Sequence, residues 1–269
     1  MLVLSCAAPE IREPDWQKLP HGVWRSPATP AVYALSEGDA ALLFGAAEGA
    51  DLAELAHAGI ARVEAVYLTH AHRASIRQAE AWRRAGLPVR ASSATAERLS
   101  PEAVRSYWQS APSPGAEGWS YLLPAEGLPS LEPAKEVSWR GWTITPVPAP
   151  GHSPDHTAYV CRRGPAVLVF AGDALAGAGT LPTPYTTDWS PDGDEGLRTA
   201  AASLRALAAL GPTALFPENG PPILEAPAAA LETTAVRAEE AAELKSYTRF
   251  ARRTGAGPPV RWLAREQAA

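Results

Sequence analysis

Four short polar motifs, each placed where a predicted strand ends or turns, constrain this sequence more than any other feature. They are Thr69-His70-Ala71-His72, Pro150-Gly151-His152-Ser153, Gly172-Asp173 and Glu218-Asn219-Gly220. Loops that leave the ends of strands are where proteins place reactive side chains on a rigid scaffold. The chain has six histidines, and three of them lie in the first two motifs. The pattern therefore predicts a site built from imidazole groups.

The first motif directly follows the apolar run Val63–Leu68, which is typical of a buried strand. On an extended segment, residues two positions apart point to the same side, so we expect His70 and His72 to share one face. Neutral imidazole is the usual nitrogen ligand of zinc. Two histidines alone are also typical of ordinary polar residues at a strand end. A third histidine, His152, and the acid Asp173 at two further strand ends favour a metal site.

The predicted strands and helices fall into two successive groups. Strands are expected near residues 23–25, 31–36, 40–45, 63–68 and 89–91, and again near 135–139, 142–147, 156–161, 166–171 and 213–216. Helices are expected near residues 51–58, 75–85, 94–99, 101–109, 192–210 and 226–253. This order favours two halves that pack sheet against sheet with helices on the outside.

A length of 269 residues fits one large domain or two small ones. No repeat or low-complexity linker divides the chain, so we expect an irregular arm over residues 1–20 and a single domain over residues 21–269, which ends in a long helix. Two segments rich in proline and glycine, 110–133 and 176–191, are expected to be loops over a site. The first of these contains a strand-like stretch, Tyr121–Leu123.

Charge and cysteine content limit the partners and the compartment. A net charge of −5 without basic runs argues against a nucleic acid or an anionic membrane as a partner, and no apolar run is long enough to span a bilayer. The two cysteines, Cys6 and Cys161, form no disulfide framework, so a reducing cytoplasmic location is expected, with Cys161 buried. We expect a small-molecule substrate. The C-terminal helix either covers the domain or forms a homodimer interface.

In this order and at these spacings, the motifs resemble those of the metallo-β-lactamase superfamily, from about residue 21 to residue 230. The family's first motif is Thr-His-x-His-x-Asp-His after a buried strand, and here that segment is Thr69-His70-Ala71-His72-Arg73-Ala74-Ser75. The family's Pro-Gly-His-Thr, Gly-Asp and Ser-His-Gly motifs correspond to the other three motifs of this chain. The resemblance implies an α/β fold, a four-layer αββα sandwich of the metallo-β-lactamase type.

The resemblance also implies a set of metal ligands, only part of which this chain keeps. The first metal of the family is held by three histidines, which correspond to His70, His72 and His152, and the acid shared by both metals corresponds to Asp173. The other ligands of the second metal fall on Ala74, Ser75 and Asn219, and neither the first two side chains nor the weak amide carbonyl of the third replaces them. We therefore expect one metal per chain, zinc ahead of iron.

Three functions are compatible with this ligand set. The first is a mononuclear hydrolase, in which a metal-bound hydroxide attacks an ester, lactone, thioester or phosphoester while Asp173 orients it or takes its proton. The second is a catalytically inactive member of the family that binds a ligand or partner, because the proton-handling acid of the family is replaced by Ala74. The third is a non-haem iron dioxygenase that uses His70, His152 and Asp173 as a facial triad.

The contribution of several neighbouring side chains stays open in the sequence. Arg73 either holds an anionic substrate group or forms a surface ion pair. His156 is either an extra ligand or a histidine that supports the site or lies on the strand surface. Glu218 is a local candidate to replace the proton-handling acid lost at Ala74, but we expect it to face solvent, as we do His21 and His57. Three tryptophans in or beside the long loops, Trp108, Trp119 and Trp189, either line a cleft or pack beneath the loops.

Overall fold

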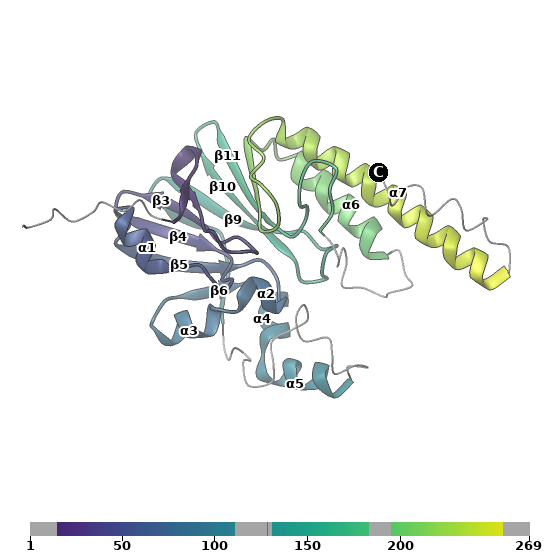
Figure 1. Cartoon of the computed structure of the whole chain (residues 1–269), viewed down its shortest axis with the longest axis horizontal. Helices are drawn as coiled ribbons and strands as arrows, with labels where there is room; N and C mark the ends of the chain where they lie inside the picture. The colour runs from purple at the N-terminus through teal and green to yellow at the C-terminus, as the bar shows by residue number, and fades with distance from the viewer. Residues whose placement is uncertain (1–14, 111–127, 129–130, 183–194, 255–269) are drawn as a thin grey trace, which may run out of the picture.

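Two β-sheets face each other in the computed structural model, and helices cover the outer face of each (Figure 1). The structure describes residues 15–110, 128, 131–182 and 195–254. The predicted strand at Tyr121–Leu123, the side chains of Trp108, Trp119 and Trp189, and Cys6 lie outside what it describes. The four-layer αββα sandwich expected from the sequence is confirmed.

The first sheet has seven strands in the same order as they occur in the chain. They are β1 (Gln17–Lys18), β2 (Val23–Arg25), β3 (Tyr33–Glu37), β4 (Ala40–Phe44), β5 (Arg62–Leu68), β6 (Val89–Ala91) and β7 (Glu132–Pro133). The first four strands pair antiparallel and the last four pair parallel. A hairpin at Glu37-Gly38-Asp39 joins β3 to β4, with Glu37 opposite Ala40.

The second sheet has five strands in the order β12-β11-β10-β9-β8. They are β8 (Val137–Trp139), β9 (Trp142–Pro148), β10 (Thr157–Arg163), β11 (Ala166–Gly172) and β12 (Ala214–Pro217). All neighbours pair antiparallel except β11 and β12, which run parallel. β10 and β11 are therefore interior strands, with both edges hydrogen-bonded.

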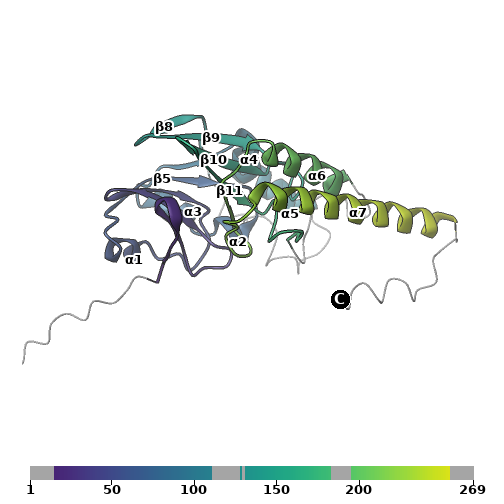
Figure 2. The same cartoon turned by 90° about the horizontal axis from the view of Figure 1, so that it is seen from above.

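The helices form the two outer layers. They are α1 (Leu52–His57), α2 (Arg73–Ile76), α3 (Ala79–Arg84), α4 (Ser93–Leu99), α5 (Pro101–Ser110), α6 (Glu195–Ala208) and α7 (Pro227–Thr254), with one 3-10 turn, η1 (Pro20–Gly22). α1 and α3 lie on the side of the first sheet, and α6 and α7 run side by side along the second (Figures 1 and 2). None of the described helices is both long and apolar enough to cross a membrane.

The alternation of side chains along the strands separates the cores. In β5, Ala65 and Tyr67 point into the core between the sheets, whereas Val66 and Leu68 point to the helices outside. The central core is aromatic: the rings of Phe44 and Phe170, one from each sheet, stack with their centroids 3.8 Å apart. A third core joins the second sheet to α6 and α7. β4 is thus buried along its whole length, as are the last residues of β5 and β11, which lead into the loops described below.

Two differences from the expected elements have clear physical causes. The single helix expected over residues 75–85 is divided into α2 and α3, because the N–H of Gln78 donates to the carbonyl of Ala46 at 2.7 Å instead of continuing the helix. The described part of the expected irregular arm contains β1, which pairs with β2.

The C-terminal helix α7 covers the second sheet together with α6. Leu231 is fully buried in the outer core, whereas Val236 and Leu244 are each 46% exposed. The far end of α7 extends past the end of α6 (Figures 1 and 2). Covering the domain is therefore a role that α7 does perform, and a homodimer interface on its exposed side stays a prediction.

Candidate metal site

His70 and His72 lie in the loop that joins β5 to α2, where the first sheet meets the second. The backbone of this loop is tied to the second sheet, because the carbonyl of Thr69 accepts the N–H of Thr157 at 2.8 Å. His72 has extended backbone angles (φ −69°, ψ 133°) and forms the N-terminal boundary of α2. The two histidines are 0% and 9% exposed. The apolar strand thus ends in an extended segment, as expected, and both imidazoles turn inward.

His152 comes from the second sheet, in the turn between β9 and β10. The turn packs closely on α6: a Cβ atom at Gly151 would lie 2.4 Å from Cα of Ala200, and Gly151 has a φ of +150°. Only glycine allows this approach of backbone to helix. His152 is 5% exposed. A helix of the outer layer therefore determines where the third histidine is held.

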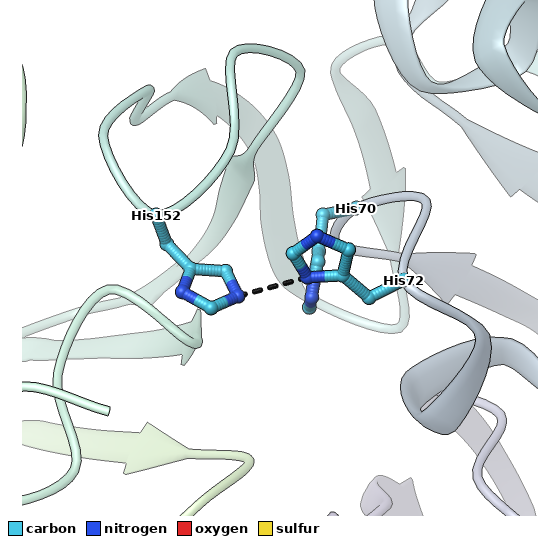
Figure 3. Close-up of side chains that lie close together, drawn as sticks. All are labelled: His70, His72 and His152. Carbon is cyan, nitrogen blue, oxygen red and sulfur yellow. Dashed lines mark hydrogen bonds between the residues drawn. The ribbon is translucent and has the colours of Figure 1, made fainter. Parts of the chain in front are cut away.

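The three histidines converge from the two sheets (Figure 3). One ligand nitrogen from each lies within 4.8 Å of those of the other two. Nδ1 of His72 and Nε2 of His152 are 2.9 Å apart, and the three ring planes are mutually close to perpendicular, at 88° to 89°. Nitrogen ligands of a tetrahedral zinc ion are about 3.3 Å apart, since each zinc–nitrogen bond is about 2.0–2.1 Å long. The sequence prediction that these three residues lie together is met in the structure.

Asp173 follows directly after β11 and faces the same point. Its Oδ2 lies 3.6 Å from Nε2 of His70 and 3.5 Å from Nε2 of His152, and the residue is 6% exposed. The preceding residue, Gly172, has a φ of +54°, and a Cβ there would lie 2.5 Å from Nε2 of His156 and 2.9 Å from Cβ of Thr69. Glycine is therefore required at this strand end for Asp173 to approach the imidazoles.

The surroundings of His70 favour a neutral ring, which has one nitrogen lone pair available to bind a metal. Burial lowers the pKa of His70 well below its usual range, and the neighbouring His72, His152 and His156 lower it further. Its Nε2 atom is buried and has no hydrogen-bond partner among the described residues. A buried nitrogen without a partner costs free energy unless something binds it. Together with the nitrogens of His72 and His152, this atom fits a divalent metal that takes imidazole ligands.

His156 lies next to these rings but uses both of its nitrogens within the protein. Its Nδ1 contacts the carbonyl of Ala149 at 3.1 Å, and its Nε2 accepts the N–H of Asp173 at 3.0 Å. Burial and the nearby His152 lower the pKa of His156 to about 3, against which the bond to Ala149 acts. His156 is 1% exposed, so it is not on the strand surface. It orients the backbone of Asp173 and has no nitrogen left for a metal.

The resemblance places the ligands of the family's second metal at Ala74, Ser75 and Asn219, around Asp173. Ala74 and Ser75 stand where the family has an acid and a histidine, and Ser75 is 1% exposed. Asn219 donates a hydrogen bond from Nδ2 to Oδ1 of Asp173 at 2.9 Å. An amide N–H thus occupies the side of Asp173 that a second cation would share. Asn219 acts as a donor here, not as the carbonyl ligand considered from the sequence.

Glu218 corrects a prediction, because it does not face solvent. It is 2% exposed, and its Oε1 accepts the hydroxyl proton of Thr69 at 2.6 Å. Burial and the charge of Asp173 raise the pKa of Glu218, and the hydroxyl groups of Thr69 and Ser75 lower it in part. The sequence offered one signal that could have indicated this: Glu218 directly follows the apolar strand β12 inside the last motif.

The structure also places the remaining candidates. Arg73 is half-buried at the first residue of α2, while His21 and His57 are exposed, as expected. Cys161 is fully buried in the core between the sheets, which raises the pKa of its thiol, and it is a free cysteine as expected. Its place in the core makes it a packing residue.

Comparisons with known proteins identify the family of this fold. The model of the metallo-beta-lactamase superfamily matches residues 27–218 of the chain. The metallo-beta-lactamase of Hirschia baltica is 21% identical at a TM-score of 0.54, over 83% of this chain and 96% of its own. FIM-1 of Pseudomonas aeruginosa, solved in its mono-zinc form, is 18% identical at a TM-score of 0.56, over 84% of this chain and 95% of its own.

A third structure shows the same likeness. BJP-1, a subclass B3 enzyme of Bradyrhizobium japonicum, is 16% identical at a TM-score of 0.60, over 88% of this chain and 95% of its own. No curated protein sequence is significantly similar. At these identities the likeness to the solved structures concerns the fold alone. The family model, however, spans well over half of the sequence, and the chain belongs to the metallo-beta-lactamase superfamily.

Proposed function

We propose that this protein is a mononuclear metal-dependent hydrolase that holds one zinc ion on His70, His72 and His152. The observation that carries the proposal is the buried Nε2 atom of His70, which has no hydrogen-bond partner among the described residues and lies beside the other two imidazoles. A zinc ion on three neutral imidazoles supplies Lewis-acid chemistry, which brings the pKa of a water nucleophile down towards ~7 and polarises a carbonyl or phosphoryl oxygen.

Asp173 handles the proton in this proposal. Its Oδ2 faces Nε2 of both His70 and His152 at 3.6 and 3.5 Å, so the oxygen borders the position that the three imidazoles surround. Its other oxygen, Oδ1, is held by the amide of Asn219. One oxygen is thereby fixed and the other is directed at the nucleophile, which it orients and from which it accepts a proton. The acid that handles protons elsewhere in the family is absent here, since Ala74 takes its place.

Two further points support one metal over two. The second ligand set lacks imidazoles, because its positions carry Ala74, Ser75 and Asn219. FIM-1, one of the structural neighbours, is itself recorded in a mono-zinc form. The substrate class that we propose is an ester, lactone, thioester or phosphoester, each of which offers an electrophilic oxygen-bearing centre to such a site.

Metal analysis of the full chain, purified without chelators, tests the proposal. We expect one zinc per chain and hydrolysis of at least one chromogenic substrate from a panel of esters, thioesters, lactones and phosphoesters. Iron in place of zinc would favour a dioxygenase built on His70, His152 and Asp173. No metal after zinc loading would favour an inactive, ligand-binding member of the family. Hydrolysis that survives His152→Ala would refute the hydrolase proposal directly.

A further inference from the structure

Glu218 is an acid that its own backbone holds inside the protein. Its N–H donates to the carbonyl of Gly172 at 2.9 Å, and its carbonyl accepts the N–H of Ala31 at 2.7 Å. Gly172 belongs to the second sheet, and Ala31 leads into the first, so the two bonds fix Glu218 between the sheets. The side chain is directed inward, towards Thr69. Burying a carboxyl group costs free energy unless the group has a hydrogen-bond partner.

A short chain of hydrogen bonds leads from this carboxyl group to His70. The Thr69 hydroxyl donates to Oε1 of Glu218 at 2.6 Å, and the same hydroxyl oxygen lies 2.9 Å from Nδ1 of His70. All three side chains are buried. A hydroxyl group has a single proton to donate. An ionised Glu218 can only accept, so the Thr69 proton then goes to Glu218, the Thr69 oxygen accepts from His70, and Nδ1 of His70 carries the ring proton.

The ring of His70 is then in the form that a metal ligand requires. With its proton on Nδ1, the ring has a lone pair on Nε2, the atom that is buried without a hydrogen-bond partner among the described residues. Histidine ligands generally donate their other ring N–H to an oxygen that fixes both the tautomer and the ring orientation. Here that oxygen is a hydroxyl, and the direction of its own bond is determined by Glu218.

We propose that Glu218 acts through Thr69 as a positioning residue that presents Nε2 of His70 to the metal. The proposal rests on the function proposed above, since it assumes that His70 is a ligand. Neither Ala74 nor Asn219 takes part in the chain of bonds from Glu218 to His70, and Ser75 acts only on the Glu218 end of it. The loss of the second ligand set therefore leaves this support of the first set intact.

Zinc affinity of the full chain, measured by competition with a chromophoric chelator, tests the proposal. Thr69→Val keeps the shape of the side chain but removes the hydroxyl, and we expect zinc to bind about 10- to 100-fold more weakly. Thr69→Ser restores the hydroxyl and should restore the affinity. Thr234→Val is a matched control, because it removes another buried threonine hydroxyl, bonded to the carbonyl of Ala230 in α7, and should leave zinc affinity unchanged.

Glu218→Gln tests the direction of the bonds. A glutamine amide can donate to Thr69 and so reverse the chain, which places the ring proton of His70 on the wrong nitrogen. We expect weaker zinc binding from this variant. The double variant with Thr69→Val should bind no more weakly than Thr69→Val alone, since both changes act through one chain of bonds. Thermal unfolding of each metal-free variant checks that it is folded.

A second measurement needs no folded variant of Thr69 or Glu218. The nitrogen-15 shifts of the metal-free wild-type protein, recorded above pH 8 so that Glu218 is ionised, report the tautomer of His70, and we expect a proton on Nδ1. A proton on Nε2, or wild-type zinc affinity in Thr69→Val, would overturn the positioning role while the hydrolase proposal stands. If the wild-type chain binds no zinc at all, it is the hydrolase proposal that fails, and the tautomer still decides whether the hydrogen-bond chain exists.

Discussion

The two halves of the candidate metal site differ in how their polar atoms are satisfied. In the half formed by the three histidines, Nε2 of His70 is buried and has no hydrogen-bond partner among the described residues. In the other half, Asn219 donates to Asp173, and Glu218 accepts from Thr69. The first half thus leaves an imidazole nitrogen available to a ligand, whereas in the second half each acid, Asp173 and Glu218, has one oxygen held by a neighbouring donor. We therefore expect a metal ion in the first half and not in the second.

The largest expected effect is the difference in zinc affinity between a substitution in the first half and one in the second half. His152→Ala takes one of three imidazoles from the first half, and we expect zinc affinity to fall by at least about 100-fold, with loss of hydrolysis. Asn219→Ala removes only a donor to Asp173 and should leave metal binding nearly unchanged. Zinc titration and metal content of both variants measure the difference, and equal losses in the two would show that the halves are not distinct.

The next effect concerns His156, which lies beside the first half but belongs to the scaffold. Its pKa is lowered to about 3 in the folded chain, whereas an unfolded histidine titrates near ~6.5, so the unfolded state takes up the proton first as the pH falls. Its stabilising contribution is therefore present above pH ~6.5 and is lost towards pH ~3. For the metal-free protein this loss is about 2 kcal/mol between pH 7 and pH 5.

Denaturant unfolding of wild-type protein and His156→Asn at pH 7 and pH 5 measures this contribution. The variant keeps a donor for the carbonyl of Ala149 but cannot titrate. It should be less stable at both pH values, because the N–H of Asp173 loses its acceptor, and yet lose less stability on acidification. The same acid sensitivity in both proteins would contradict a buried neutral His156.

The smallest effect is a change of metal content from one to two. Ala74→Asp, Ser75→His and Asn219→His together restore the ligand types of the second half and remove the amide that now bonds Asp173. We expect the metal content per chain to rise from one towards two in elemental analysis. The rise fails if the buried carboxyl of Glu218 has closed the space, in which case adding Glu218→Ser should reopen it.

The fold and the three-histidine cluster could be predicted from the sequence because both depend on where strands end. Val63–Leu68, the turn at Pro150-Gly151 and the Gly172-Asp173 strand end all mark such places, and the structure finds the expected residues together there. Local sequence patterns are sufficient to predict a site residue when its motif directly follows a recognisable strand. The order of the motifs then provides the long-range arrangement.

Glu218 and His156 could not be placed in the same way. The partner of Glu218 is Thr69, which is 149 positions away in the chain, and no local pattern shows that the loop after β12 lies against it. The ring of His156 is buried beside the rings of His70 and His152, so the strand-surface alternative fails because of contacts that a single strand does not reveal. Buried polar residues are determined by their partners, and partners are a property of the assembled fold.

The origin of the histidines in different sheets has a consequence for how the molecule is held together. His70 and His72 leave the first sheet, while His152, 80 positions after His72, leaves the second. A metal ion bound by these residues would link the two sheets, because it can form all its bonds only when the sheets are packed together. Metal binding and the packing of the two sheets are then thermodynamically linked. A change that weakens the packing also weakens metal binding, and removal of the metal weakens the packing.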